Sequence, residues 1–127
     1  MARFDPAGNP VWSKQIGTDG DDFAYGISLG GDHILVVGGT SGNLVSGAYT
    51  GGEDAFLRFY DLDGNVLGTQ EFGGGLNDSG RGVIAYKGGH LVSGTKNGTA
   101  LGTLSIGDND AFVMRIAPPP PVVQPVK

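Results

Sequence analysis

Short apolar runs alternate along the chain with turns that are rich in Gly, Asn, Asp and Ser. Runs of this length between turn residues predict β-strands. The run "ILVV" (34–37) is apolar at consecutive positions, which indicates a strand covered on both faces. No stretch has a convincing 3.6-residue period, so we expect an all-β fold. In one complete period the predicted strands are "DAFLRFYD" (54–61), "NVLGTQEFG" (65–73), "GRGVIAYKG" (80–88) and "HLVSGTK" (90–96).

Glycine, proline and asparagine mark the corners between these strands. The turn "DLDGN" (61–65) can place Gly64 at the positive-φ position of a short hairpin. The turn "DPAGN" (5–9) places Pro6 where its fixed φ of about −65° suits the bend. The pattern therefore predicts antiparallel neighbours joined by tight hairpins.

The sequence repeats itself after about 56 residues, which indicates a repeat architecture. Matches at this offset are Gly17 with Gly73, Asp22 with Asp78, and "DAF" at 54–56 with "DAF" at 110–112. Other matches need small shifts in the alignment. A one-residue gap brings Thr40 opposite Thr95, and an insertion brings Arg3 opposite Arg58, with Arg115 as a third copy.

Four antiparallel strands in each period, with burial on both faces, are typical of the blades of a β-propeller. We expect two four-stranded blades and a closing strand, nine strands in a four-plus-four-plus-one pattern. Residues 1–57 form the first repeat, and residues 58–117 form the second with the closing strand. A β-solenoid is the alternative, but hairpins inside the repeat argue against it. The Pro-rich segment 118–127 predicts an extended tail or linker.

Two blades cannot close a propeller, which has about four to eight. We expect closure by oligomerisation of the chain or by neighbouring repeats of a longer propeller. If the run 80–88 is the innermost strand, the last blade lacks its outer strand and the N-terminus carries a spare one. We expect this spare strand, residues 11–17, to pair beside residues 110–117 of a neighbouring chain, with residues 1–5 redundant. The other reading is that the chain is a fragment cut from a longer propeller.

Charge and composition exclude several classes of partner. The net charge is −5 without a basic cluster, which argues against nucleic acid and anionic membranes. No run of 18 apolar residues predicts a membrane span, and no signal peptide is visible. The absence of Cys excludes disulfides and Cys-ligated zinc.

Four blocks resemble the bacterial SBBP-type β-propeller repeat over residues 3–116. They are "DAFLRFYDLDGN" (54–65), "WSKQIG" (12–17), "DFAYGI" (22–27) and "GGTSGNL" (38–44). The second copy departs from the pattern, since Gly68 replaces Trp12 and Arg81 replaces Tyr25. The resemblance implies a propeller in a secreted or surface-attached bacterial protein, and it implies little chemistry.

Aromatic residues that do not recur are the candidate binding residues. Trp12, Tyr25 and Tyr49 have no aromatic counterpart in the second copy, and Arg81 aligns with Tyr25. In propeller lectins, aromatic rings and donors of this kind flank sugars that bind between blades. Packing between blades is the plainer interpretation of each residue, and Trp12 could also belong to the exchanged strand.

The remaining polar groups favour structural roles. Arginines that recur with the repeat suggest pairing with Asp22 or Asp78 rather than catalysis. The turn 61–65 lacks the spacing and distal Glu of a calcium loop, and His33 and His90 have no second ligand nearby in sequence. We find no catalytic motif and expect no metal or other cofactor.

We therefore expect a non-enzymatic β-propeller module for interaction or scaffolding in an extracellular or cell-surface bacterial protein. The alternative is an oligomeric propeller lectin that binds carbohydrate between blades. An enzyme, for example a lyase or hydrolase, is disfavoured because no acid–base pair is evident.

Overall fold

The computed structural model describes residues 1–98 and 106–117, and within these residues the chain forms nine β-strands and no helix. All strand pairs within its sheets are antiparallel. The strands are β1 (Ala2–Phe4), β2 (Pro10–Ser13), β3 (Asp22–Gly30), β4 (His33–Thr40), β5 (Asp54–Asp61), β6 (Val66–Phe72), β7 (Ser79–Tyr86), β8 (Gly89–Lys96) and β9 (Asp110–Ile116). The predicted Pro-rich tail, 118–127, lies outside the described residues.

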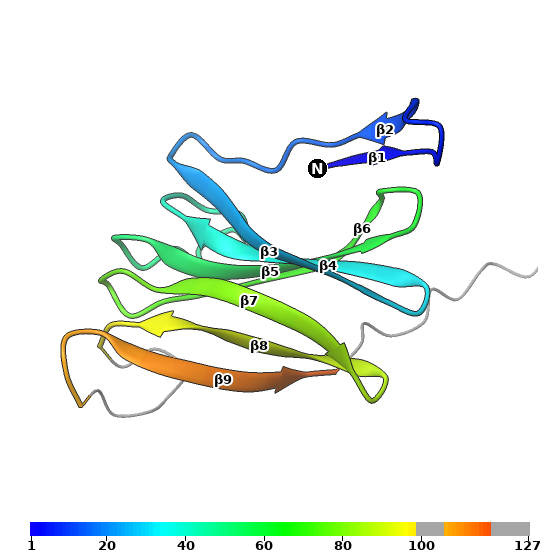
Figure 1. Ribbon diagram of the computed structural model, residues 1–127. Coiled ribbons are helices and arrows are strands. Elements are labelled where there is room, and N and C mark those ends of the chain that lie inside the picture. The colour runs from blue at the N-terminus through cyan, green and yellow to red at the C-terminus, as the bar shows by residue number, and fades with distance from the viewer. Residues whose placement is uncertain (99–105, 118–127) are drawn as a thin grey trace, which may run out of the picture.

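The nine strands form three sheets, as Figure 1 shows: the hairpin β1-β2, the four-stranded sheet β3-β4-β5-β6 and the three-stranded sheet β7-β8-β9. The expected nine strands are confirmed among the described residues, and so is a last sheet that lacks its outer strand, but the expected grouping into two four-stranded sheets and a closing strand is wrong. Each outer strand follows its neighbour through a short turn and stays in that sheet, whereas the next strand begins a new sheet. Sheets are therefore out of phase with repeats counted from residue 1, and a repeat boundary at 57/58 falls inside β5.

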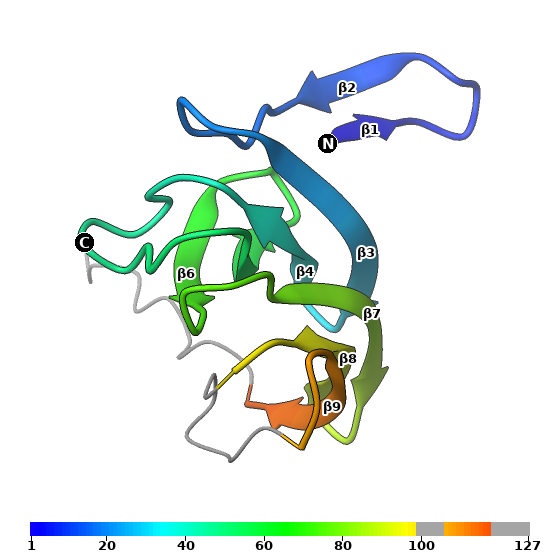
Figure 2. The same cartoon turned by 90° about the vertical axis from the view of Figure 1, so that its left-hand side faces the viewer.

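The two larger sheets pack face to face, and their apolar side chains form the main core. Strands β3 and β7 lie side by side at one edge of this pair, as Figures 1 and 2 show. Strand β4 is buried over most of its length, which confirms the prediction for 34–37. The core between the sheets contains Leu35, Val37, Leu57 and Phe59 from one sheet and Val92 and Phe112 from the other.

The pairing registers show one uniform offset in residue number between the two sheets. Gly38 pairs with Phe56, and Gly94 pairs with Phe112. The residue numbers of both paired residues therefore increase by the same amount from the first sheet to the second. We name this spacing, from Gly38 to Gly94, the repeat offset. A β-carbon at either glycine would collide with the carbonyl oxygen of the neighbouring strand and with the ring of that phenylalanine. The expected one-residue gap is therefore wrong.

Two alignments of the sequence change with this register. Thr40 pairs with Asp54 and Lys96 pairs with Asp110, so Lys96 rather than Thr95 is the counterpart of Thr40. Local identity between two threonines produced the false gap.

The three arginines do not share one position either. Arg3 pairs with Trp12, as Phe59 pairs with Gly68, so Arg3 corresponds to Phe59. Arg115 pairs with Leu91, as Phe59 pairs with Leu35, and it occupies the same position in the third sheet. Arg58 lies one residue earlier, on the opposite face of its strand.

The arginines contact other partners than the expected Asp22 and Asp78. Arg3 Nη1 donates to Leu62 O at 3.0 Å, and Arg58 Nε donates to Thr69 Oγ1 at 2.8 Å. Arg115 Nη2 donates to Lys87 O at 3.4 Å. Two of these bonds reach backbone carbonyl groups, and the third reaches a side chain on the adjacent strand. Such bonds suit structural roles.

The turns 5–9 and 61–65 have the same structure. Asp5 Oδ1 accepts the N–H groups of Ala7 and Asn9 at 2.9 and 2.8 Å. Asp61 Oδ1 accepts those of residues 63 and 65 at the same two distances. Gly8 and Gly64 have φ values of 87° and 82°, where glycine is favoured. The carboxylate of Asp61 thus closes a hairpin turn, as the sequence predicts.

The hairpin β1-β2 lies against the free face of the four-stranded sheet (Figure 1). Trp12 Nε1 donates to Leu62 O at 3.2 Å, and the indole covers Gly64. Met1 and Ile16 pack against Val36, Phe56 and Tyr60 beneath the hairpin. This contact covers only part of the face.

Candidate interaction surface

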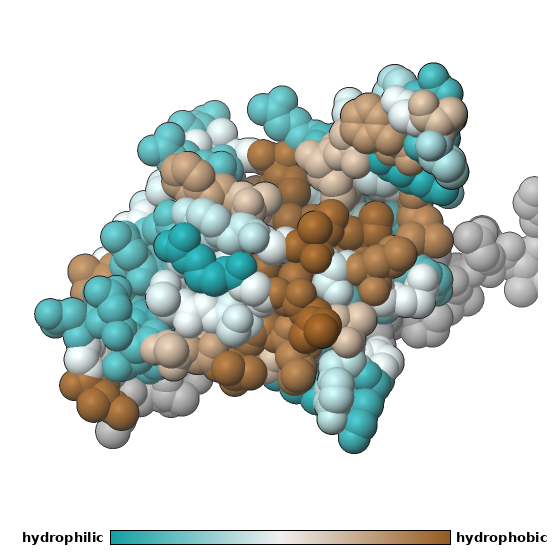
Figure 3. All heavy atoms as spheres, in the orientation of Figure 1, coloured by the Kyte–Doolittle hydropathy of each residue, from teal (hydrophilic) through white to brown (hydrophobic). Residues whose placement is uncertain are grey.

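The free face of the four-stranded sheet exposes apolar side chains along β3. Ile27 and Leu29 are 60% and 64% exposed, although their neighbours Ile34 and Val36 are largely buried. Figure 3 shows a band of apolar residues that runs from below the hairpin across the middle of the larger sheets. Large apolar side chains gathered on one surface mark a candidate interaction site.

A groove separates the hairpin from β3. At one end it forms a hollow of about 450 Å³ lined by Arg3, Trp12, Ile27, Leu29 and Leu62, among others. Met1 and Ala2 line this hollow and two adjoining ones that continue along β3. We name the exposed face of β3 and β4 together with this groove the leading face.

The opposite end of the molecule, the outward face of β7-β8-β9, also exposes apolar side chains. Val113 is 75% exposed, and Ile84 and Tyr86 are 64% and 43% exposed. The outer edge of β9 has no partner strand among the described residues. We name this face and the β9 edge the trailing face.

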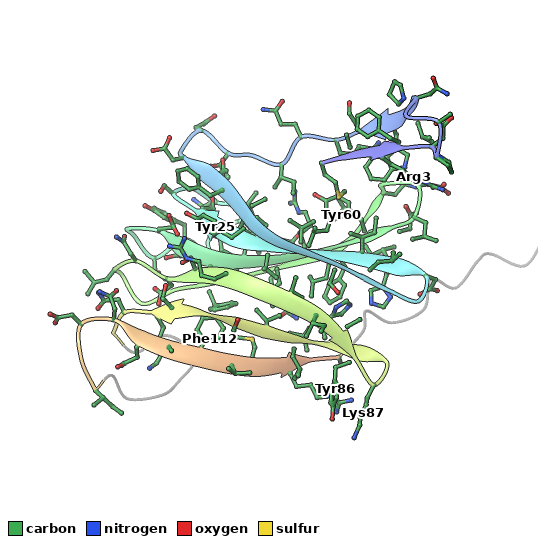
Figure 4. The ribbon with its side chains drawn as sticks, in the orientation of Figure 1. Arg3, Tyr25, Tyr60, Tyr86, Lys87 and Phe112 are labelled. Atoms are coloured by element: carbon green, nitrogen blue, oxygen red, sulfur yellow. The ribbon has the colours of Figure 1, made fainter. Side chains whose placement is uncertain are left out.

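Of the predicted binding residues, the structure brings Tyr25 and Arg81 together. The Arg81 guanidinium lies 4.0 Å from the centre of the Tyr25 ring, which spans the junction of β3 and β7. The ring of Phe23 stacks beside Tyr25 with centroids 5.9 Å apart. Figure 4 shows Tyr25 at the edge where the two larger sheets meet.

Trp12 and Tyr49 do not join this pair. Trp12 lies in the hairpin and contacts the turn 61–65. Tyr49 lies in the loop before β5, where its hydroxyl donates to Gly52 O at 2.9 Å. The four residues therefore do not form one pocket.

Each larger sheet is also braced by aspartates at the start of its strands. Asp54 Oδ2 accepts the Thr50 N–H at 2.7 Å, and Asp78 Oδ2 accepts the Gly74 N–H at 2.9 Å. Asp22 and Asp110 accept from the residue four positions earlier in the same way. These repeated bonds fix the loops that precede the strands.

Asp54 and Asp78 are both fully buried. Burial raises the pKa of Asp78, and the nearby Asp54 raises it further, whereas bonds from the Asn97 and Gly74 N–H groups and the buried Lys96 oppose this change. Thr40 Oγ1 donates to Asp22 Oδ1 at 2.5 Å in the first sheet. In the second sheet the corresponding position carries Lys96, whose charge favours the ionised form of Asp78.

A buried histidine pair, which the sequence did not predict, lies at the other end of the interface. His33 Nε2 and His90 Nε2 lie 2.9 Å apart, and both rings pack against Phe59. A β-carbon at Gly30 would lie 3.0 Å from the His90 ring, so glycine leaves room for the pair. The two histidines are far apart in sequence, and only the packing of the sheets joins them. The one signal in the sequence for this pair was that each histidine lies beside a predicted hairpin turn of its own repeat.

The hydrogen-bond geometry assigns one tautomer to each neutral ring of the pair. His33 Nδ1 lies 3.2 Å from Asp32 Oδ1, so it carries the proton and His33 Nε2 accepts. His90 Nε2 then donates, and its buried Nδ1 has no hydrogen-bond partner among the described residues. Burial lowers the pKa of His90 below its usual range, and the adjacent His33 lowers it further.

The described residues contain no group of three or more His, Cys, Asp or Glu side chains suited to a metal ion. Within the same part of the chain, no helix has the length and apolar character needed to cross a membrane.

Comparison with known proteins adds one relative. The chain is 31% identical over 109 residues to "Regulatory protein FlaEY" of Caulobacter vibrioides (strain ATCC 19089 / CIP 103742 / CB 15), a match that covers 80% of this chain. It spans 11% of the length of that relative. No family model matches the sequence.

Proposed function

We propose that this chain is a non-enzymatic β-propeller module that serves interaction or scaffolding. The observation that carries the proposal is the face-to-face packing of successive antiparallel sheets that share one repeat offset. Sheets that repeat in this way, with their first strands side by side, suit the radial arrangement of propeller blades. The resemblance to SBBP-type repeats supports the same reading.

The exposed side chains favour binding over catalysis. Both ends of the described structure present apolar residues, and the strongest polar clusters are used internally, in loops and between sheets. The name of the FlaEY relative describes regulation and specifies no chemistry. An extracellular or cell-surface location remains part of the proposal and can be checked by fractionating cells that express the natural gene.

Covalent tandems test the propeller. Two, three and four copies of the full chain joined end to end would contain four, six and eight repeats. We expect one of them to give the small-angle scattering profile of a closed ring and a sharp unfolding transition. Elongated particles at all three lengths would overturn the proposal.

The contact of Arg81 with Tyr25 favours carbohydrate binding as a second candidate. An aromatic ring beside a guanidinium offers an apolar surface and hydrogen-bond donors in one place. A glycan array with the wild-type chain and the Arg81→Ala variant tests this function. Specific binding that the variant loses supports a lectin, and absence of binding by the wild-type chain removes the candidate.

A further inference from the structure

We propose that copies of this chain associate head to tail, with the trailing face of one copy on the leading face of the next. In this contact β9 of the first copy takes the place of β1 in the second, and β2 of the second copy becomes the outer strand beside β9. The inference rests on the proposed function, because it assumes that successive sheets pack in one repeating way.

The contact inside the chain supplies the template. One side of it comes from the four-stranded sheet, through Leu35, Val37, Leu57 and Phe59. The other side comes from the three-stranded sheet, through Val83, Val92, Phe112 and Ile116. Each side has a counterpart, one repeat offset away, that lies outside this contact, and the hairpin covers most of the counterpart on the leading face.

The leading face corresponds to the second side of that contact. Moving back by one repeat offset from Val83, Val92, Phe112 and Ile116 gives Ile27, Val36, Phe56 and Tyr60. All four are apolar, and the last three form the small core beneath the hairpin. The leading face therefore has the composition of a surface that receives another sheet.

The trailing face corresponds to the first side. Moving forward by one repeat offset from Leu35, Val37, Leu57 and Phe59 gives Leu91, Ser93, Val113 and Arg115. Val113 is 75% exposed here, whereas its counterpart Leu57 is fully buried. Leu91 and Val113 keep the apolar character of their counterparts, whereas Ser93 and Arg115 are polar. Because both positions of the observed contact recur on opposite ends of one chain, a second copy is the partner that fits both.

Strand β1 occupies the place that β9 would take. Arg3 and Arg115 are two repeat offsets apart and share one register position, so β1 corresponds to residues 114–116. All three residues of β1 are exposed, and the strand is much shorter than β9. Exchange would therefore replace a short pairing with a longer one and cover the outer edge of β9, which has no partner strand in the part of the chain that the structure describes.

The β5-β6 pairing fixes the register of the exchanged strands. Arg58 pairs with Thr69 there, so Met114 of one copy should pair with Ser13 of the next. Within a single copy, Ser13 pairs with Ala2 instead. The two arrangements are therefore distinguishable by cross-linking.

The chain has no cysteine, which permits a clean disulfide experiment. Met114→Cys and Ser13→Cys are made as separate variants and mixed under mild oxidation. We expect a mixed disulfide between copies, formed at least tenfold faster than with Gln15→Cys, an exposed control two residues out of register. Equal rates for the two mixtures would overturn the proposed register.

Sedimentation measures the association itself. We expect the wild-type chain to have a multiple of the 13.0 kDa mass, and Val113→Lys to reduce it to one copy. Leu76→Lys, at an exposed apolar position in the loop before β7, should leave the mass unchanged.

Two sedimentation results would overturn the inference: a wild-type monomer, or a Val113→Lys variant that stays associated. A monomer alongside a ring-forming tandem would reject self-association and leave the propeller intact. Failure of the tandems as well would reject both proposals.

Discussion

At the scale of single residues, Gly38 and Gly94 show how closely the strands approach. Each glycine faces a backbone carbonyl of the adjacent strand and the ring of a buried phenylalanine. Both glycines serve the same purpose in sheets of different sequence. Their equivalence is the clearest sign that one backbone plan recurs at the repeat offset.

Replacing Gly38 by alanine should destabilise the fold by about 1–3 kcal/mol, because the paired strands cannot move apart to admit a methyl group. Gly68→Ala is the matched control in β6, where a β-carbon meets no atom of the described residues within 4 Å. We expect the control to be neutral or slightly stabilising. Urea unfolding measures both, and a Gly38→Ala midpoint equal to that of the control would contradict the argument.

The His33–His90 pair should make the contact between the sheets sensitive to acid. Because the folded state lowers the pKa of His90, its contribution is complete above the unfolded value of about 6.5 and is lost as the pH falls toward the folded pKa. Protonation of His90 would also add an N–H at Nδ1, a buried atom that has no hydrogen-bond acceptor among the described residues. We expect stability against urea to fall between pH 7.5 and pH 5.

His90→Leu is the variant that tests this prediction, since it removes the titrating ring and keeps an apolar side chain in the core. The decline in stability between pH 7.5 and pH 5 should become shallower. If the variant loses stability with acid as steeply as the wild type, other groups cause the effect.

At the scale of elements, Lys96 and Asp78 should give the opposite pH dependence. The folded state raises the pKa of Asp78, so this residue's contribution is complete below the unfolded pKa and falls as the pH rises through the folded value. Lys96→Met removes a cation that opposes the shift. The loss of stability that Lys96→Met causes relative to the wild type should therefore be larger at pH 8 than at pH 5, measured by urea unfolding.

The control for that variant is Lys87→Met, which removes an exposed lysine from the β7-β8 turn. It should change stability little, and equally at both pH values. A Lys96→Met effect that does not depend on pH would show that packing, and not charge, explains the role of Lys96.

Strands and turns were predictable because their signals are local. The turns 5–9 and 61–65 each contain a glycine and a carboxylate, and consecutive apolar residues in β4 predict its burial. The exact register was not predictable, because Thr95 resembles Thr40 more than Lys96 does. The histidine pair was missed for a related reason, since its two members meet only through the packing of separate sheets.

At the scale of the whole molecule, burial is concentrated in the middle of the chain. Strands β4 and β5 have pairing partners on both sides and are mostly buried, whereas β1 and β2 are mostly exposed. We expect amide hydrogens of β4 and β5 to exchange slowest and those of β1 fastest. Hydrogen exchange followed by mass spectrometry checks this order.

Association should alter that pattern at one place. If copies exchange strands, β2 becomes protected at high protein concentration while residues 1–4 stay unprotected. Protection of β1 and β2 together at every concentration would indicate that the hairpin remains closed.

The uniform repeat offset also means that the order of the strands does not depend on where the polypeptide starts. Asp5 and Asp61 open identical turns, and the corresponding position after β9 is Ala117. Consider a permuted chain in which residues 18–116 come first and residues 5–17 follow, so that Ile116 is joined directly to Asp5. In this chain β2 would follow β9 through that same turn and pair beside it. Its two sheets would each hold four strands on one polypeptide, without borrowing any from a neighbour.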